Sequence, residues 1–301
     1  MLKLFSDNLL PVFLAAGAGW LLKALLDLDP RPIARTAFYI FAPCLIFRII
    51  VDSEVPGEAL VRMVAFATIS LLVVAALAAV AARLMGCSRT LVAATFVVVL
   101  LPNAGNYGLS ANLFAFGEQG LAQAGVFFVT SAILTFTVGV FVASLGRTSL
   151  RTALARLPRV PTVWAVVVAL VMSRAGWSLP VPVDRTVELL SQASIPVFLI
   201  VLGMQLHGVG LQGPYGPVAA ASAMRLVGGA LAAFALSSAF GLEGAARQAG
   251  VLQSAMPSAV ICIVIASEYD AEPAFVTSVV VLTTVLSPVT LTPILAFLGA
   301  G

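Results

Sequence analysis

The sequence of 301 residues contains little charge: 10% of its residues are charged, whereas 61% are hydrophobic and the mean hydropathy is +1.09. Soluble domains carry about 25% charged residues. So few charges cannot cover a surface that faces water, and the composition therefore predicts an integral membrane protein in contact with lipid. The apolar runs are long and uninterrupted, unlike the ~10-residue alternating strands of a membrane barrel. The expected fold class is an all-α polytopic membrane protein.

Histidine and cysteine are scarce as well. His207 is the single histidine and lies in a Gly-rich turn, and the three cysteines are Cys44, Cys87 and Cys262. These numbers predict neither a disulfide framework nor a metal site. The apolar runs hold no nucleophile–base pair and no acid pair, so we expect no enzyme and no cofactor. A GxxxxGK[ST] motif is lacking, so ATP is not expected as the driving force. The net charge of +3 gives no reason to expect a nucleic-acid partner.

Ten stretches reach the ~20 apolar residues that a membrane-spanning helix requires. They lie near residues 6–26, 32–51, 59–85, 89–116, 119–146, 161–178, 185–206, 215–241, 244–269 and 273–298. The loop 147–160 has four arginines and no acid, so the positive-inside rule places it in the cytoplasm. Both termini are then extracytoplasmic, and the protein is expected to lie in the inner (plasma) membrane. The acidic 51–58 loop falls outside, and only the acidic 268–272 loop disagrees with this orientation.

The two halves, 1–146 and 161–301, share landmarks. Pro43 and Pro196 are 153 residues apart, and Pro102 and Pro257 are 155 residues apart. A duplicated unit with five helices must be inverted in the second half, which predicts a five-plus-five inverted repeat, as in many secondary transporters. The alternative is that prolines are simply frequent in membrane helices.

Pro102 and Pro257 each fall about 13 residues into an apolar run, or ~20 Å along a helix. Proline breaks a helix, and the freed backbone groups need a protein-lined cavity at this depth. Each new half-helix start is the positive end of a dipole and favours an anion. No charged residue occupies the central turns of either helix, which favours an anion over a cation. The polar residues beside the breaks are the expected substrate contacts: Asn103, Asn106, Tyr107, Gln253, Ser254 and Ser258.

Each of these residues has an alternative, structural explanation. Asn103 and Asn106 could only cap the break, and Tyr107 could fill the space that Gly105 and Gly108 leave. Gln253 and Ser254 could only satisfy freed carbonyl groups. A lone proline in a membrane helix is more often a kink than a site, so the prediction depends on the matching pair of breaks.

Other polar residues stand inside the spans. Thr130 and Ser131 could complete a site or hold sodium, or could join helices by hydrogen bonds. Gln192 is a candidate for the substrate path. Arg225 could pair with Glu268 or Asp270, as an ion pair that holds the fold or couples a proton, or could snorkel toward the cytoplasm. The small-residue runs at 15–19 and 227–233 predict close helix packing.

Three stretches of this sequence resemble the auxin efflux carrier family: "LPNAGNYGL", "ASIPVFLIVLGMQL" and "QSAMPSAV". The resemblance runs in order over the whole chain. It implies ten helices, a scaffold domain (helices 1, 2, 6 and 7) and a transport domain (helices 3–5 and 8–10). In this family, whose fold is similar to bile-acid symporters and NhaA-type antiporters, helices four and nine cross at their prolines. The resemblance therefore implies that these two helices cross at Pro102 and Pro257, and that Asn103 and Asn106 contact the substrate.

The resemblance also implies an elevator-type movement of the crossover domain and a homodimer formed through the scaffold domain. The 147–160 loop is short, so the phosphorylated loop of the long plant carriers is absent and auxin becomes doubtful as the substrate. We expect a secondary transporter, with efflux of a small organic anion, auxin-like or a dicarboxylate. The alternatives are a sodium- or proton-coupled importer and a sensor that binds without transport.

Overall fold

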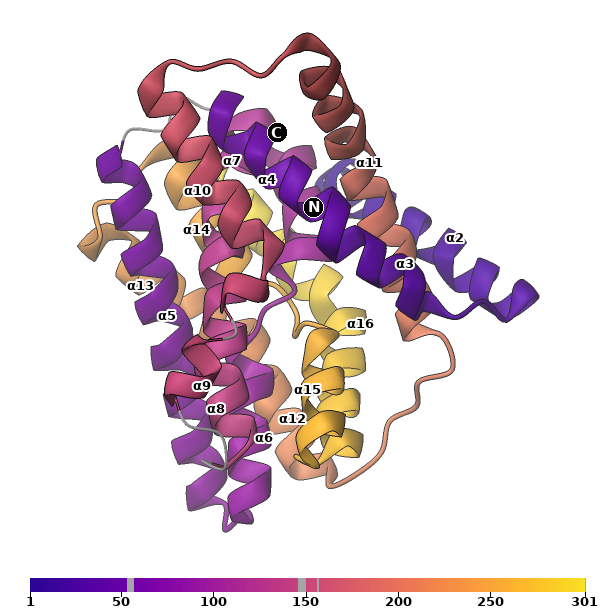
Figure 1. Cartoon of the computed structure of the whole chain (residues 1–301). Coiled ribbons are helices and arrows are strands. Elements are labelled where there is room, and N and C mark those ends of the chain that lie inside the picture. The colour runs from indigo at the N-terminus through magenta and orange to yellow at the C-terminus, as the bar shows by residue number, and fades with distance from the viewer. Residues whose placement is uncertain (53–56, 146–149, 156, 301) are drawn as a thin grey trace.

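A computed structural model describes residues 1–52, 57–145, 150–155 and 157–300 of the chain (Figure 1). These residues form helices joined by short connections, and the one extended pairing among them is an antiparallel bridge between Pro102 and Ser258. The all-α expectation is therefore confirmed for the described part of the chain. Arg147 and Arg156 of the basic loop and Glu54 of the acidic loop lie outside the described residues.

In the first half, helices merge end to end where the chain passes through wide, π-type turns (the η elements). The elements are α1 (Leu2–Leu4), η1 (Phe5–Leu9), α2 (Leu10–Leu26), α3 (Pro30–Thr36), η2 (Ala37–Phe41), α4 (Ala42–Asp52), α5 (Gly57–Leu84), α6 (Arg89–Leu100), η3 (Ala104–Leu109), α7 (Ser110–Leu134), η4 (Thr135–Gly139) and α8 (Val140–Ala143). Gly117, with φ of 63°, kinks α7 where the sequence predicts a boundary between two spans. Only glycine adopts this conformation at little cost.

The second half contains one π-type turn, η6, and one short 3₁₀ turn, η5. The elements are α9 (Leu150–Leu154), η5 (Leu157–Arg159), α10 (Pro161–Ala175), α11 (Val181–Leu206), α12 (Tyr215–Ala223), η6 (Met224–Gly228), α13 (Gly229–Ala239), α14 (Gly244–Ser254), α15 (Ile261–Tyr269) and α16 (Pro273–Phe297). Pro196 stays inside α11, and Pro288 and Pro293 stay inside α16, without ending these helices.

Seven helical rods in the described residues are long and apolar enough to cross a membrane. They cover Leu2–Leu26, Pro30–Asp52, Gly57–Leu84, Ala104–Ala143, Val181–Leu206, Tyr215–Ala239 and Pro273–Phe297. The ten stretches expected from the sequence differ because α6, α10, α14 and α15 are short, and because the 40-residue rod across Gly117 covers parts of two expected spans. The chain is a multi-pass helical membrane protein, and ten crossings remain a prediction.

The rods fall into two sets by packing. In the first, α11 packs along α2 and α4, and α10 packs along α4 (Figure 1). In the second, α5, α6, α7, α13 and α14 pack on one another, with α12, α15 and α16 against them. The predicted close packing of the 15–19 run is confirmed, because a Cβ on Gly19 would meet the backbone oxygen of Ile200 in α11 at 2.1 Å.

Candidate functional site

The two proline breaks lie against each other. The extended residues after α6 pair with those after α14, since the Asn103 amide donates to the Pro257 carbonyl at 2.7 Å. The Ala259 amide donates to the Leu101 carbonyl at 2.8 Å. This antiparallel pair satisfies backbone groups that both proline-terminated helices leave free. Segments about 155 residues apart in the sequence thus meet at one buried point.

We call the point where the two breaks meet the junction, and Ser258 stabilises it by two hydrogen bonds. Its backbone amide donates to the Thr283 hydroxyl of α16 at 3.1 Å, and its own hydroxyl donates to the Val98 carbonyl of α6 at 2.8 Å. The residue is completely buried. Because both of its polar groups already have protein partners, the structure gives Ser258 a place in the joint between helices rather than an open hydrogen-bonding group.

Asn103 differs, because its side-chain amide nitrogen is buried without a hydrogen-bond partner in the described structure. It is the residue before η3, so it stands at the start of the new half-helix. Asn106 is half-buried in the first turn of η3. Tyr107 is buried: its hydroxyl is 3.3 Å from the Ser287 hydroxyl and its ring packs on Phe13. Only Asn103 of these three therefore offers a buried donor that is free for a ligand.

Gln253 and Ser254 end α14 beside the junction, and both are buried. The Gln253 amide nitrogen donates to the carbonyls of Ala104 and Ala124 at 3.1 and 3.2 Å, so it ties α14 to the opposite break. Its side-chain oxygen and the Ser254 hydroxyl have no partner in the described structure. Glycine at 108 makes room for Gln253, because a Cβ there would meet its Oε1 at 2.0 Å. The junction thus contains several unused polar atoms, which are the natural contacts of a ligand or water.

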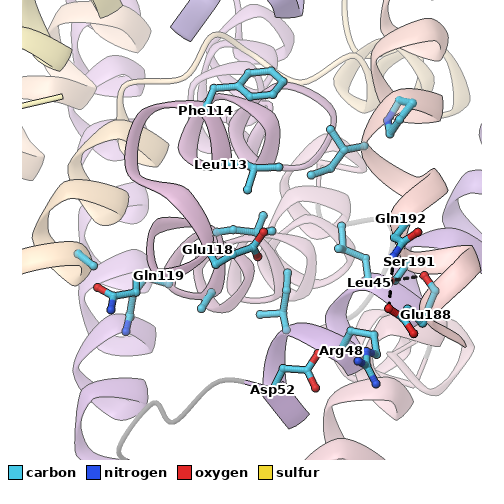
Figure 2. Close-up of a pocket in the computed structure, with 17 residues that line it drawn as sticks. Leu45, Arg48, Asp52, Leu113, Phe114, Glu118, Gln119, Glu188, Ser191 and Gln192 are labelled. Atoms are coloured by element: carbon cyan, nitrogen blue, oxygen red, sulfur yellow. Dashed lines mark hydrogen bonds and ion pairs between the residues drawn. The ribbon is translucent and has the colours of Figure 1, made fainter. Parts of the chain in front are cut away.

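A cavity of about 970 Å³ lies between the two sets of rods (Figure 2). One wall is formed by α4 and α11, and the other by α7 near its Gly117 kink, and Ala245 of α14 also lines the cavity. In Figure 2, Glu188, Ser191 and Gln192 line one side and Glu118 and Gln119 come from the opposite helix. Its size is in the range of small-molecule sites.

The cavity holds Arg48, which the sequence-based prediction missed. Arg48 pairs with Asp52 at 3.0 Å and with Asp184 at 2.8 Å, and about a fifth of its side chain (23%) stays exposed. It is the one basic residue on the described lining, beside three carboxylates: Asp52, Glu118 and Glu188. A charged residue within the apolar run 32–51 was the sequence feature that could have revealed it.

Among the predicted residues, Gln192 and Pro196 line this cavity and the junction residues do not. The Gln192 amide donates to the Glu188 carboxylate at 3.4 Å. Pro196 belongs to α11 and Pro43 to α4, which pack together, and the Ser194 hydroxyl of α11 donates to the Phe41 carbonyl of η2 at 2.9 Å. The structure therefore divides the predicted site into a buried junction and a wider cavity.

The hydroxyl groups of Thr130 and Ser131 both bond within their own helix. The Thr130 hydroxyl donates to the Val126 carbonyl at 2.9 Å and that of Ser131 to the Phe128 carbonyl at 2.8 Å, both within their own helix. Such bonds are frequent for Ser and Thr in helices because the carbonyl three or four residues back is within reach. These two hydrogen bonds therefore join no second helix, and a role of Thr130 and Ser131 in the site or in holding sodium stays a prediction.

Arg225 and Glu268 are also not paired. Arg225 is completely buried and its guanidinium donates to the carbonyls of Val99 and Ser254, while Glu268 is exposed near the end of α15. Among the described residues no ion pair includes Arg225. Both expectations for this arginine, an ion pair or a snorkelling side chain, are thus wrong.

Comparison with known proteins bears on the identity of the chain. The family model described as "membrane transport protein" matches residues 145–295. An uncharacterized transporter of Methanothermobacter thermautotrophicus is 26% identical over 292 residues, which are 95% of this chain and 96% of that protein. Auxin efflux carrier component 6 of Arabidopsis thaliana is 28% identical over 143 residues, 45% of this chain and 25% of that protein. The chain belongs to this membrane transport protein family, which is the auxin efflux carrier family, and is a membrane transporter.

Proposed function

We propose that the protein is a secondary transporter that carries a small organic anion out of the cell, with the anion bound at the junction of the two proline breaks. The observation that carries this proposal is the buried, unpartnered amide nitrogen of Asn103 at the start of η3. A helix start presents N–H groups and about half a positive charge, and a neutral amide donor beside it completes an anion site. The similarity to an auxin efflux carrier supports a carboxylate as the ligand.

The two sets of rods support movement of one set against the other. The set α2, α4, α10 and α11 corresponds to the predicted scaffold domain, and the remaining long helices to the predicted transport domain. The cavity lies where the two sets face each other. An elevator-type shift of the transport domain would close this cavity and open its counterpart on the opposite side, which is alternating access. The five-plus-five repeat fits the similar short helices before each break, Arg89–Leu100 and Gly244–Ser254.

The acidic cavity lining supports outward release. In the orientation from the positive-inside rule, the cavity opens on the extracytoplasmic side, because α4 ends and α11 begins there. Its three carboxylates outnumber the single guanidinium of Arg48, so the lining is acidic overall. An anion that reaches this side is therefore held weakly and leaves, which favours efflux. The homodimer through the scaffold domain stays a prediction.

Thermal stabilisation of the purified protein by a panel of mono- and dicarboxylates tests the site. One class should raise the melting temperature saturably in the wild type. Asn103→Ala should raise the half-saturating concentration of that ligand at least tenfold, which corresponds to a loss of about 1.4 kcal/mol in binding free energy. Asn8→Ala is the matched control, because Asn8 is also buried but its amide already donates to the Leu4 carbonyl at 3.0 Å. A shift that survives in Asn103→Ala would move the site away from the junction, and a shift with sodium alone would favour the coupled importer.

Arg48→Gln tests the cavity as the path of the anion. Partly exposed ion pairs contribute about 1 kcal/mol or less, so the melting temperature should fall by only a few degrees at most. For carboxylate presented from the cavity side, transport should nevertheless show a KM raised severalfold, because the one cation of the described lining is lost. Arg62→Gln is the control, since Arg62 pairs with Glu58 at the surface and does not line the cavity. Equal KM values in both variants would exclude this path.

A further inference from the structure

Arg225 is the largest fully buried side chain among the described residues. It lies in η6, in the middle of the rod Tyr215–Ala239, and none of its surface is exposed. Gly229, one turn further on, provides the space: a Cβ there would lie 2.6 Å from the guanidinium nitrogen Nη2. A buried charge without partners is strongly unfavourable, so its partners determine what it does.

The guanidinium donates to one carbonyl at the end of each broken helix: Val99 in the last turn of α6, and Ser254, the last residue of α14. Neighbouring carbonyls already have partners. Val98 accepts from the Ser258 hydroxyl, and the carbonyls of Leu252 and Gln253 accept from the Ala255 and Met256 amides. Arg225 therefore donates to carbonyl groups that would otherwise be buried and without a partner at the two helix ends.

The positive charge of the guanidinium also matches the negative partial charges of the two helix ends. Each helix end carries about half a negative charge, so two ends meeting at one point approximate the charge of one carboxylate. No carboxylate of the described residues pairs with the guanidinium, and the two carbonyl ends take that role. A metal cation held by converging carbonyl oxygens would satisfy the same two helix ends.

We propose that Arg225 is a built-in cation, a positioning residue that occupies the place where a bound metal cation would otherwise hold the two helix ends together. Because the positive charge belongs to the chain and is always present, the junction forms without sodium. Given the proposed function, anion transport then does not depend on a sodium gradient. Removal of the guanidinium leaves an unoccupied, electronegative space that small cations are able to fill.

The test compares melting temperatures of the purified protein in sodium chloride and in choline chloride of equal ionic strength. The wild type should give equal values in both salts. Arg225→Ala should melt well below the wild type in choline, and millimolar sodium or guanidinium ion should raise its melting temperature saturably. Arg225→Lys should retain much of the stability, whereas Arg225→Met, which is close to lysine in size but neutral, should not. A sodium-dependent wild type, or Arg225→Met as stable as the wild type, would overturn the proposal.

Two features keep the result interpretable. If Arg225→Ala cannot be purified, the comparison of Arg225→Lys with Arg225→Met decides alone, because both side chains are unbranched and of similar size and differ chiefly in the ammonium charge and its N–H donors. Melting temperatures need no substrate, so the proposed anion transport is judged separately: wild-type flux of carboxylates in liposomes without sodium supports both proposals. No flux under any gradient would reject the transport proposal and leave the thermal result standing.

Discussion

Gly203→Ala is expected to destabilise the protein severely, because α2 and α11 touch through their backbones at this residue. A Cβ on Gly203 would lie 1.7 Å from the Ala16 carbonyl oxygen and 2.9 Å from the Trp20 amide nitrogen. The helices would have to separate by roughly 2 Å to reach an ordinary contact of about 3.5 Å. Neither atom belongs to a flexible side chain that could move aside. We expect a loss of about 3 kcal/mol, the upper part of the range for overpacked sites.

Thermal unfolding in detergent, followed by size-exclusion chromatography, measures this effect. Gly17→Ala is the matched control, since Gly17 lies on the same helix α2 and a Cβ there meets nothing within 4 Å. That variant should be as stable as the wild type or slightly more so, by up to about 1 kcal/mol, because alanine favours the helix. If Gly203→Ala and Gly17→Ala melted alike, the close contact of α2 with α11 would be wrong.

Gln253→Glu is expected to abolish transport although the two side chains have nearly the same shape. The Gln253 amide nitrogen donates to the carbonyls of Ala104 and Ala124. A carboxylate has no donor when ionised, so a buried negative charge would face two carbonyl oxygens. Unpaired buried charges of this kind cost about 3–5 kcal/mol. Because the residue ties α14 to the opposite break, the loss should appear as at least a hundredfold lower transport.

Carboxylate flux into liposomes and the melting temperature are the two measurements. Gln248→Glu is the control on the same helix: Gln248 is half-buried and donates to a single carbonyl, that of Leu298, at 2.9 Å. The destabilisation of Gln253→Glu should be smaller at pH 5 than at pH 8, since a protonated carboxyl regains one donor. Wild-type flux in Gln253→Glu would show that this tie between the breaks is unnecessary for transport.

The role of single polar residues could be predicted only in part. The breaks at Pro102 and Pro257 were predicted because each proline removes a backbone donor beside a cluster of polar residues. Proline alone does not decide a break, since Pro196, Pro288 and Pro293 stay inside their helices. Asn103 was expected at the break and lies there with a free amide nitrogen. Arg48, by contrast, belongs to the cavity only because α4 packs beside α11, where Asp184 reaches it from 136 residues away. Thr130 and Ser131 bond within their own helix, which a list of polar positions does not reveal.

The sequence by itself determined the membrane environment and the all-α class, which follow from composition, and it indicated the two breaks at Pro102 and Pro257, where proline stands beside polar residues. Family membership was also visible in the motif around Pro102. Only the tertiary structure decided which groups meet. Arg225 could have paired with an acid or reached the surface, yet it donates to Val99, 126 residues away, and to Ser254. The packing of helices that are distant in the sequence determines which partner a long side chain reaches, and the residues around it in the sequence do not reveal that packing.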